Sequence, residues 1–197
     1  LEMVHNKNYV EAFISGKIEK KKMRKIGLPW SRELVDKTLF TSGGTILCGT
    51  LALENGIACN LGGGTHHAFS DFGSGFCIFN DVSVAIRHLL SEGKIKKALI
   101  IDLDVHQGDG TAFIHKNEKE IYTFSMHCKE NFPFLKQESD FDLPLDQGTK
   151  DEEYKIIFEI IDHAYLPYLS FLLISYRRLI LSIFKSIFLT GKYSFFI

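Results

Sequence analysis

The sequence contains only four cysteines among 197 residues, and none of them forms a C-x-x-C motif. A small number of cysteines without this motif is typical of a cytosolic protein whose thiols are reduced and mostly buried. The first five residues also lack the charged and apolar regions of a secretory signal peptide. We therefore expect a cytoplasmic protein without a disulfide framework.

Neither sign of charge dominates, because 23 lysines and arginines are balanced by 24 aspartates and glutamates. A net charge of −1 gives no electrostatic case for a nucleic acid partner, and we expect none. A basic run does lie between Lys17 and Lys25. Such a run is most simply a solvated helix face or loop.

Acidic residues are absent from His163 to Ile197, where Phe, Ile, Leu, Ser and Tyr predominate. The longest uncharged stretch of this region, from Ala164 to Tyr176, is shorter than the ~20 residues of a membrane-spanning helix, so a membrane partner is not expected. The change in composition predicts a domain over residues 1–168. Residues 169–197 are then expected to be an aberrant apolar tail, read out of frame or degenerate.

The most informative stretch runs from Ile100 to Gly110 and begins as an apolar strand. Asp102, Asp104 and His106 alternate, so along a strand they point to one side. A carboxylate is costly to bury unless it is paired or bound to a metal. The triplet could offer oxygen and nitrogen ligands to Zn²⁺, although the polar mouth of a buried strand would look the same.

A second polar motif, Gly62-Gly63-Gly64-Thr65-His66-His67, follows a short strand predicted over residues 57–61. The glycines allow the backbone to pass close to a ligand. Two adjacent histidines alone would usually be surface side chains. At the end of a strand, directly after three glycines, they favour catalysis.

The order of predicted elements brings the two motifs together. The strand over 57–61, a helix over 82–91 and a strand over 97–103 form a βαβ unit with parallel strands. Ligands of such sheets gather at the carboxyl ends of strands, where both motifs fall. We therefore expect neighbouring strand ends in an α/β fold. Further helices are predicted over 4–14, 32–55 and 149–164, and further strands over 120–126 and 140–145.

Three motifs in order resemble the histone deacetylase superfamily, the arginase-like zinc deacetylases. They are Gly-Gly-Gly-Thr-His-His-Ala-Phe from Gly62, Gly-Phe-Cys-Ile-Phe-Asn-Asp from Gly75, and Asp-Leu-Asp-Val-His-Gln-Gly-Asp-Gly from Asp102. The runs Thr123–His127 and Asn131–Phe134 are most similar to the class IV branch and its bacterial relatives. The resemblance extends from about Val4 to Tyr168. It implies a three-layer α/β/α, arginase/deacetylase-like fold.

The resemblance also implies a reaction, the zinc-dependent hydrolysis of an acetyl- or acyl-lysine amide. Asp104 and His106 would be zinc ligands. His67 would be the general base and acid, held by Asp109, and His66 would be its companion, paired with Asp102. The expected K⁺ ligands are Asp102, the backbone carbonyls of Asp104, His106 and Met126, and the Ser125 side chain. The residues expected to line the acyl-lysine channel are Gly75, Phe76, Phe132 and Phe134.

Two parts of the family pattern are not found in the sequence. The resemblance implies a third zinc ligand, an Asp after a later strand, and in many branches a Tyr in a glycine-rich loop. We therefore expect a truncated deacetylase domain, missing both ends, with weak zinc binding and little activity. His127 and His163 are the candidates for a replacement ligand.

Two alternatives remain open. One is a small-molecule amidohydrolase of the same superfamily that acts on acetylpolyamines or similar acetylated amines. The other is an inactive remnant or an interaction protein. A truncated sheet would leave unpaired edges and exposed apolar faces, which would favour self-association.

Overall fold

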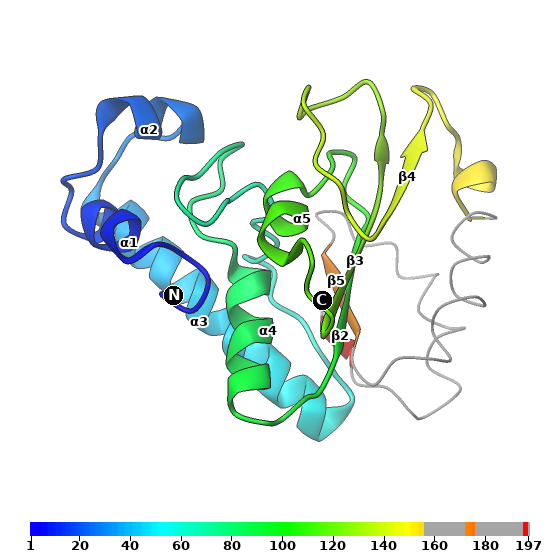
Figure 1. The fold of residues 1–197 in the computed structure, drawn as a ribbon, viewed down its shortest axis with the longest axis horizontal. Coiled ribbons are helices and arrows are strands. Elements are labelled where there is room, and N and C mark those ends of the chain that lie inside the picture. Colours follow the sequence, from blue (N-terminus) through cyan, green and yellow to red (C-terminus); the bar gives the residue numbers. More distant parts are fainter. Residues whose placement is uncertain (156–171, 176–194, 197) are drawn as a thin grey trace.

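The computed structural model describes residues 1–155, 172–175 and 195–196, which form a parallel sheet covered by helices (Figure 1). The helices are α1 (Lys7–Ile14), α2 (Lys20–Ile26), α3 (Arg32–Asn55), α4 (Asp81–Ser91) and α5 (Asp109–His115). The strands are β1 (Ile57–Ala58), β2 (Ala98–Asp102), β3 (Ile121–Cys128), β4 (Phe141–Leu145), β5 (Leu172–Ser175) and β6 (Phe195–Phe196). Every pairing is parallel, which confirms the predicted α/β class.

Strand β2 lies inside the sheet, between β5 and β3, and all of its residues are buried. Its sequence is a continuous apolar run that ends at Asp102. Continuous runs of this kind are typical of strands covered on both faces by helices. The register pairs Asp102 with Ser125 of β3, so a polar residue of the neighbouring strand lies beside the polar end of β2.

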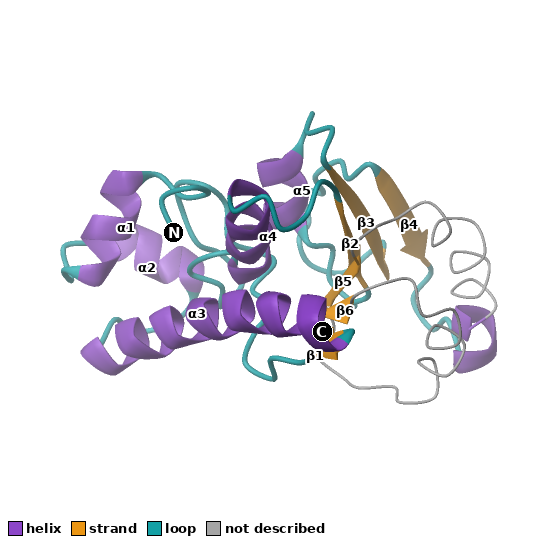
Figure 2. Cartoon of the chain, turned by 90° about the horizontal axis from the view of Figure 1, so that it is seen from below, coloured by secondary structure: helices purple, strands orange, loops and turns teal. Residues whose placement is uncertain are grey.

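One face of the sheet is covered by α4, and α3 packs against α4 (Figure 2). Helix α4 begins at the side chain of Asn80, which accepts a hydrogen bond from the Ser83 N–H at 3.0 Å. The core here consists of buried aliphatic side chains, among them Val82, Ala85, Ile86, Leu89, Ile100 and Ile121. Residues 151–155 form a helical turn on the opposite side of the sheet.

The predicted neighbourhood of the two strand ends is wrong in one respect. Strands β1 and β2 are parallel but not adjacent, because β6 and β5 lie between them. Strand β1 is also shorter than predicted. The chain leaves the sheet where the Asn60 side chain donates to Thr45 Oγ1 at 2.6 Å and accepts from the Gly62 N–H at 3.1 Å. These bonds turn the backbone toward α3 and leave a long loop to carry the histidines.

The tail contributes two strands to the described part of the chain. Residues 172–175 pair with β2, and residues 195–196 pair with β1 and β5. The boundary predicted at residue 168 lies outside the described residues and stays a prediction. The helix predicted over 149–164 is seen over residues 151–155, and its remainder also lies outside them.

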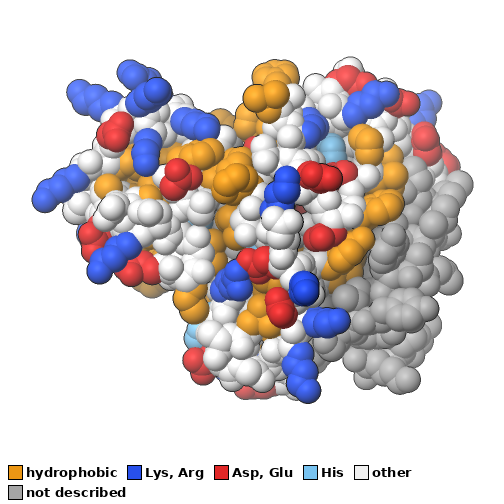
Figure 3. All heavy atoms as spheres, viewed as in Figure 1, with side chains coloured by type: hydrophobic (Ala, Val, Ile, Leu, Met, Phe, Trp, Pro, Cys, Tyr) orange, Lys and Arg blue, Asp and Glu red, His pale blue; other side chains and the backbone are white. Residues whose placement is uncertain are grey.

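The basic run between Lys17 and Lys25 is solvated, as predicted. Its charged side chains are exposed, apart from a half-buried Lys22, and they gather over α2 in Figure 3. Among the helices that the structure describes, none combines the length and the apolar character needed to cross a bilayer.

A buried histidine ties the N-terminal segment to the middle of the chain. His5 is 2% exposed. Its Nδ1 lies 3.0 Å from the Phe69 carbonyl, and its Nε2 accepts a hydrogen bond from the Asn80 N–H at 2.9 Å. Burial lowers the pKa of His5 to about 4, because the surroundings accommodate the neutral ring and not the cation.

This histidine predicts acid instability. The neutral ring stabilises the fold fully above the ordinary pKa of 6.5, and this contribution is lost as the pH falls from 6.5 through the folded-state pKa of about 4. The expected loss is roughly 3 kcal/mol of unfolding free energy. It is measured by urea denaturation at pH 7.5 and pH 4. His5→Gln, which keeps an acceptor but does not titrate, should flatten the pH dependence, whereas His88→Gln should not. Equal slopes in all three proteins would contradict the prediction.

Candidate active site

The Asp-x-Asp-x-His motif begins at Asp102, the last residue of β2, and its Asp104 and His106 lie on the turn that follows the strand. The Asp102 carboxylate accepts the Asp104 N–H at 3.0 Å, and the Asp104 carboxylate accepts the His106 N–H at 2.9 Å. Each aspartate thus closes a tight turn two residues ahead, as aspartates commonly do. The prediction that strand alternation aligns these side chains is therefore wrong, and two successive side-chain turns align them instead.

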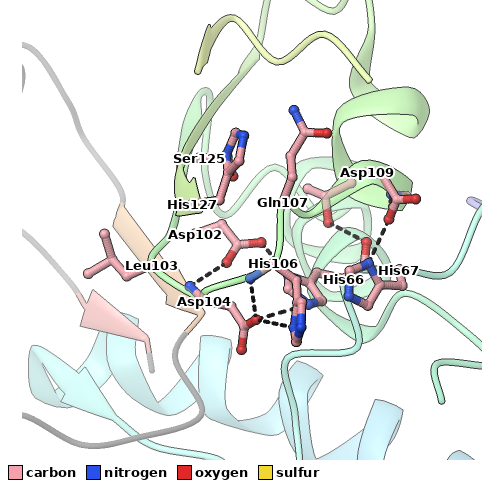
Figure 4. A network of polar contacts seen from close by, with 12 residues as sticks. His66, His67, Asp102, Leu103, Asp104, His106, Gln107, Asp109, Ser125 and His127 are labelled. Atoms are coloured by element: carbon pink, nitrogen blue, oxygen red, sulfur yellow. Dashed lines mark hydrogen bonds and ion pairs between the residues drawn. The ribbon is translucent and has the colours of Figure 1, made fainter. Parts of the chain in front are cut away.

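These turns bring the Asp104 and His106 side chains together at the end of β2 (Figure 4). Asp104 Oδ1 lies 3.0 Å from Nδ1 of His106 and 4.0 Å from Nε2 of His66. Asp104 is half-buried, and the His106 side chain is 38% exposed. An oxygen and a nitrogen ligand therefore converge at an accessible point.

His66 and His67 lie beside this point, and each is held by a carboxylate. Nδ1 of His66 is 2.5 Å from Asp102 Oδ2, and Nδ1 of His67 is 2.6 Å from Asp109 Oδ1. The two ring centroids are 4.1 Å apart. Both predicted pairings are present, although the four residues come from a loop, the end of β2 and the start of α5.

The two histidines differ in pKa. Burial works to lower the pKa of His66, but the adjacent Asp102 carboxylate outweighs it and raises the pKa to about 9. Burial lowers the pKa of His67, and the hydrogen bond to Asp109 does not reverse this. At neutral pH the arrangement therefore favours a protonated His66 and a neutral His67. In the neutral ring, Nδ1–H donates to Asp109 and Nε2 is left as a proton acceptor.

The buried carboxylate of Asp81, in the first turn of α4, fixes the histidine loop. Asp81 is fully buried and accepts hydrogen bonds from the Gly64 N–H at 3.1 Å and from the Thr65 N–H at 2.7 Å. It also accepts the hydroxyls of Thr65 at 2.5 Å and Thr45 at 2.6 Å. A β-carbon on Gly63 would lie 2.6 Å from the same carboxylate, so a glycine is required there.

The residues predicted to line a channel divide into an inner and an outer pair. The Phe132 ring lies edge-on to His67, with centroids 4.9 Å apart. Gly75 has φ of +52°, and a β-carbon there would lie 2.7 Å from His67 Cδ2 and 3.1 Å from Phe132 Cε1. Phe76 is 59% exposed and Phe134 is 89% exposed, so neither of these two side chains is enclosed.

The residues predicted to bind K⁺ are close in the sheet, since Ser125 is the β3 partner of Asp102 and Met126 follows it. Both are buried. The Ser125 hydroxyl lies 3.0 Å from Nδ1 of His127, which is also 3.9 Å from Asp142. His127 is thus engaged away from Asp104, and His163 lies outside the described residues.

The donor set fits a zinc ion only in part. Asp104 and His106 are suitable ligands, but catalytic zinc takes three protein ligands and a water. Within residues 1–155, 172–175 and 195–196, no group of three or more His, Cys, Asp or Glu side chains is arranged to hold a metal ion.

Sequence reasoning missed Asp81 as a loop anchor and Gln107 as a buried link. Gln107 is 1% exposed and bonds to the segment after β3. In both cases the sequence offers the same signal, a polar residue inside an otherwise apolar or glycine-rich motif. Such a residue, once buried, requires a hydrogen-bonding partner elsewhere in the fold.

Comparison with known proteins agrees with this geometry. Residues 1–170 match the family model of the histone deacetylase domain. The chain belongs to the histone deacetylase family. An uncharacterized protein from Picosynechococcus is 54% identical over 154 residues, which are 78% of this chain and 51% of that protein. Histone deacetylase 2 from Arabidopsis thaliana is 38% identical over 57% of this chain and 30% of its own length.

Two further similar proteins extend the comparison. The acetoin utilization protein AcuC from Staphylococcus aureus is 35% identical over 68% of this chain and 37% of its own. The crystal structure of an HDAC homolog from Aquifex aeolicus superposes with a TM-score of 0.70 at 25% identity, over 87% of this chain and 53% of that one. The chain spans about half or less of the length of these curated relatives.

The Asp81 network predicts a stability effect. Asp81→Asn removes the charge that four donors share and turns an amide N–H₂ toward some of them, so unfolding free energy should fall by about 2 kcal/mol. Urea denaturation at pH 7.5 measures it. The control is Asp36→Asn, which breaks an exposed ion pair with Arg32 and should change stability by less than about 0.5 kcal/mol. Equal effects at the two positions would contradict the assigned role of Asp81.

Proposed function

We propose that this histone deacetylase domain hydrolyses the amide bond of an acetyl- or acyl-lysine with the help of Zn²⁺. The observation that carries the proposal is the site itself, two carboxylate-held imidazoles beside the Asp104–His106 pair. Family membership supports the same reaction class.

His67 is the general base in this proposal. Its Nδ1 is held by Asp109, so its free Nε2 accepts the proton of the attacking water and later returns it to the leaving amine. His66, paired with Asp102, remains protonated and stabilises negative charge on the reacting carbonyl oxygen. The carboxylates fix each ring in orientation and tautomer.

Asp104 and His106 would hold the zinc ion. When bound, zinc lowers the pKa of a water and polarises the substrate carbonyl. A third ligand that followed β5 would reach them, because Ser175 at the end of β5 pairs with Asp102. The residues after Ser175 are Tyr176, Arg177 and Arg178, which offer no carboxylate. We therefore propose weak zinc binding for this sequence.

The remaining assignments follow the same resemblance. K⁺ is proposed to bind through Asp102, Ser125 and the backbone carbonyls of Asp104, His106 and Met126. Gly75 and Phe132 would flank the acyl-lysine stem, with Phe76 and Phe134 at the rim. The proposed location is the cytoplasm, and the partners are acetylated proteins or small acetylated amines. Self-association through sheet edges stays a prediction, as does the division at residue 168.

Zinc binding is predicted to be weak, and Asp104→Ala should lower the zinc affinity by at least a further factor of about ten. Isothermal titration of the purified chain with ZnCl₂ measures both, with Asp36→Ala as the control that leaves binding unchanged. Tight 1:1 binding by the unaltered chain would contradict the two-ligand site and point to His127 or His163 as a third ligand.

Activity is predicted to be low, zinc-dependent and dependent on His67. With ZnCl₂ present, His67→Gln should reduce the rate of acetyl-lysine peptide hydrolysis by about 100-fold, because the proton acceptor is lost. His88→Gln is the control. A parallel assay with acetylputrescine distinguishes the small-molecule alternative. No turnover of either substrate would favour the inactive remnant.

A further inference from the structure

Gln107 uses its entire side-chain amide inside the protein. Nε2 donates to the Gln137 carbonyl at 2.7 Å and to Asp142 Oδ1 at 2.8 Å, and Oε1 accepts the Gln137 N–H at 2.8 Å. The side chain therefore holds both backbone groups of one residue, as a neighbouring strand would. Since Gln107 is 1% exposed, water does not replace these bonds readily.

The residues on either side of Gln107 belong to the site around the imidazoles, whereas the Gln107 side chain does not. His106 precedes it, Asp109 follows two residues later, and in Figure 4 the Gln107 side chain extends away from the imidazoles while His106 points toward them. One short turn thus carries a proposed zinc ligand, the carboxylate that holds His67, and the clamp on Gln137.

The clamped segment is a closed unit. Next to Gln137, the Lys136 ammonium donates to the Asn131 and Pro133 carbonyls, each at 2.6 Å. This fastens the end of the segment that Gln107 holds to the end that carries Phe132. The tip between them is exposed, with Leu135 at 84%.

Phe132 is where this unit meets the active site. Its ring centroid lies 4.9 Å from that of His67 and 6.1 Å from that of His106. The glycine at position 75 leaves just enough room for this ring beside His67. A movement of the segment would therefore change how closely the Phe132 ring lies to the two histidines.

We propose that Gln107 is a positioning residue. It fastens residues 131–137 to the turn between His106 and Asp109 and so keeps Phe132 against His67 and His106. Its role in catalysis rests on the proposed function, because Phe132 then flanks the acyl-lysine stem. Gln107 sets the position of that ring from behind, without touching the substrate. The placement of Phe132 by the clamp is a property of the chain itself and is testable without turnover.

The first test is residue-resolved amide hydrogen exchange of the full chain and of Gln107→Met, which has similar volume but cannot clamp. We expect exchange over residues 131–137 to become at least about tenfold faster. The His67 ring-proton resonances should also shift as the Phe132 ring moves away. Ser83→Ala, which removes the buried bond to His115, is the control and should leave both readouts unchanged. Unchanged exchange at 131–137 in a folded Gln107→Met would overturn the proposal.

If Gln107→Met does not fold, Gln107→Asn provides the same comparison, because it keeps an amide but is one methylene too short to hold both groups of Gln137. The second test is kinetic, with zinc and an acetyl-lysine peptide. Gln107→Met should raise KM by about fivefold with kcat within about twofold, and should have no further effect in a Phe132→Ala background. A full effect in that background would overturn the link to Phe132. If the unaltered chain shows no turnover, the proposed function fails, while the exchange experiment still decides the clamp.

Discussion

The buried carboxylate of Asp102 is the constraint on which the site depends. It lies at the end of a fully buried strand, 3% exposed, where an unpaired charge would be very costly. One oxygen holds His66 at 2.5 Å, and the other closes the turn that presents Asp104. The imidazole pair and the acid–imidazole pair are therefore not two independent features. They share the Asp102 carboxylate, and each donates a hydrogen bond that stabilises this charge in its buried position.

Much of this arrangement was predictable from the sequence. The apolar run before Asp102, the glycines before His66 and the helix predicted over residues 82–91 each carry a strong local signal, and the structure has all three elements. The pairings of His66 and His67 followed from a resemblance that extends over several motifs, and membership of the histone deacetylase family supports that resemblance.

The remainder could not be predicted because it depends on tertiary contacts. Nothing local to Ile57 shows that strands from residues 172–175 and 195–196 pair between β1 and β2. Likewise, Asp81 looks like an ordinary residue in a first helical turn until the loop it anchors is seen beside it. Gln107 has partners about thirty residues away, at a distance where spacing carries no information. The alternation of Asp102, Asp104 and His106 does not reveal the turn after Asp102, because successive side-chain turns leave the same pattern in a sequence as a strand does.

The order of strands in the sheet also has a consequence for how the chain acquires its shape. In the described part of the chain, β1 pairs with β6 through Ile57 and Phe195, and β5 and β6 lie between β1 and β2. Contacts between residues so far apart in the sequence form late and slowly, because closing the long loop between them costs conformational entropy before the contacts stabilise the fold. The part of the sheet between the histidine loop and the aspartate turn is therefore complete only after β5 has paired with β2 and β6 with β1.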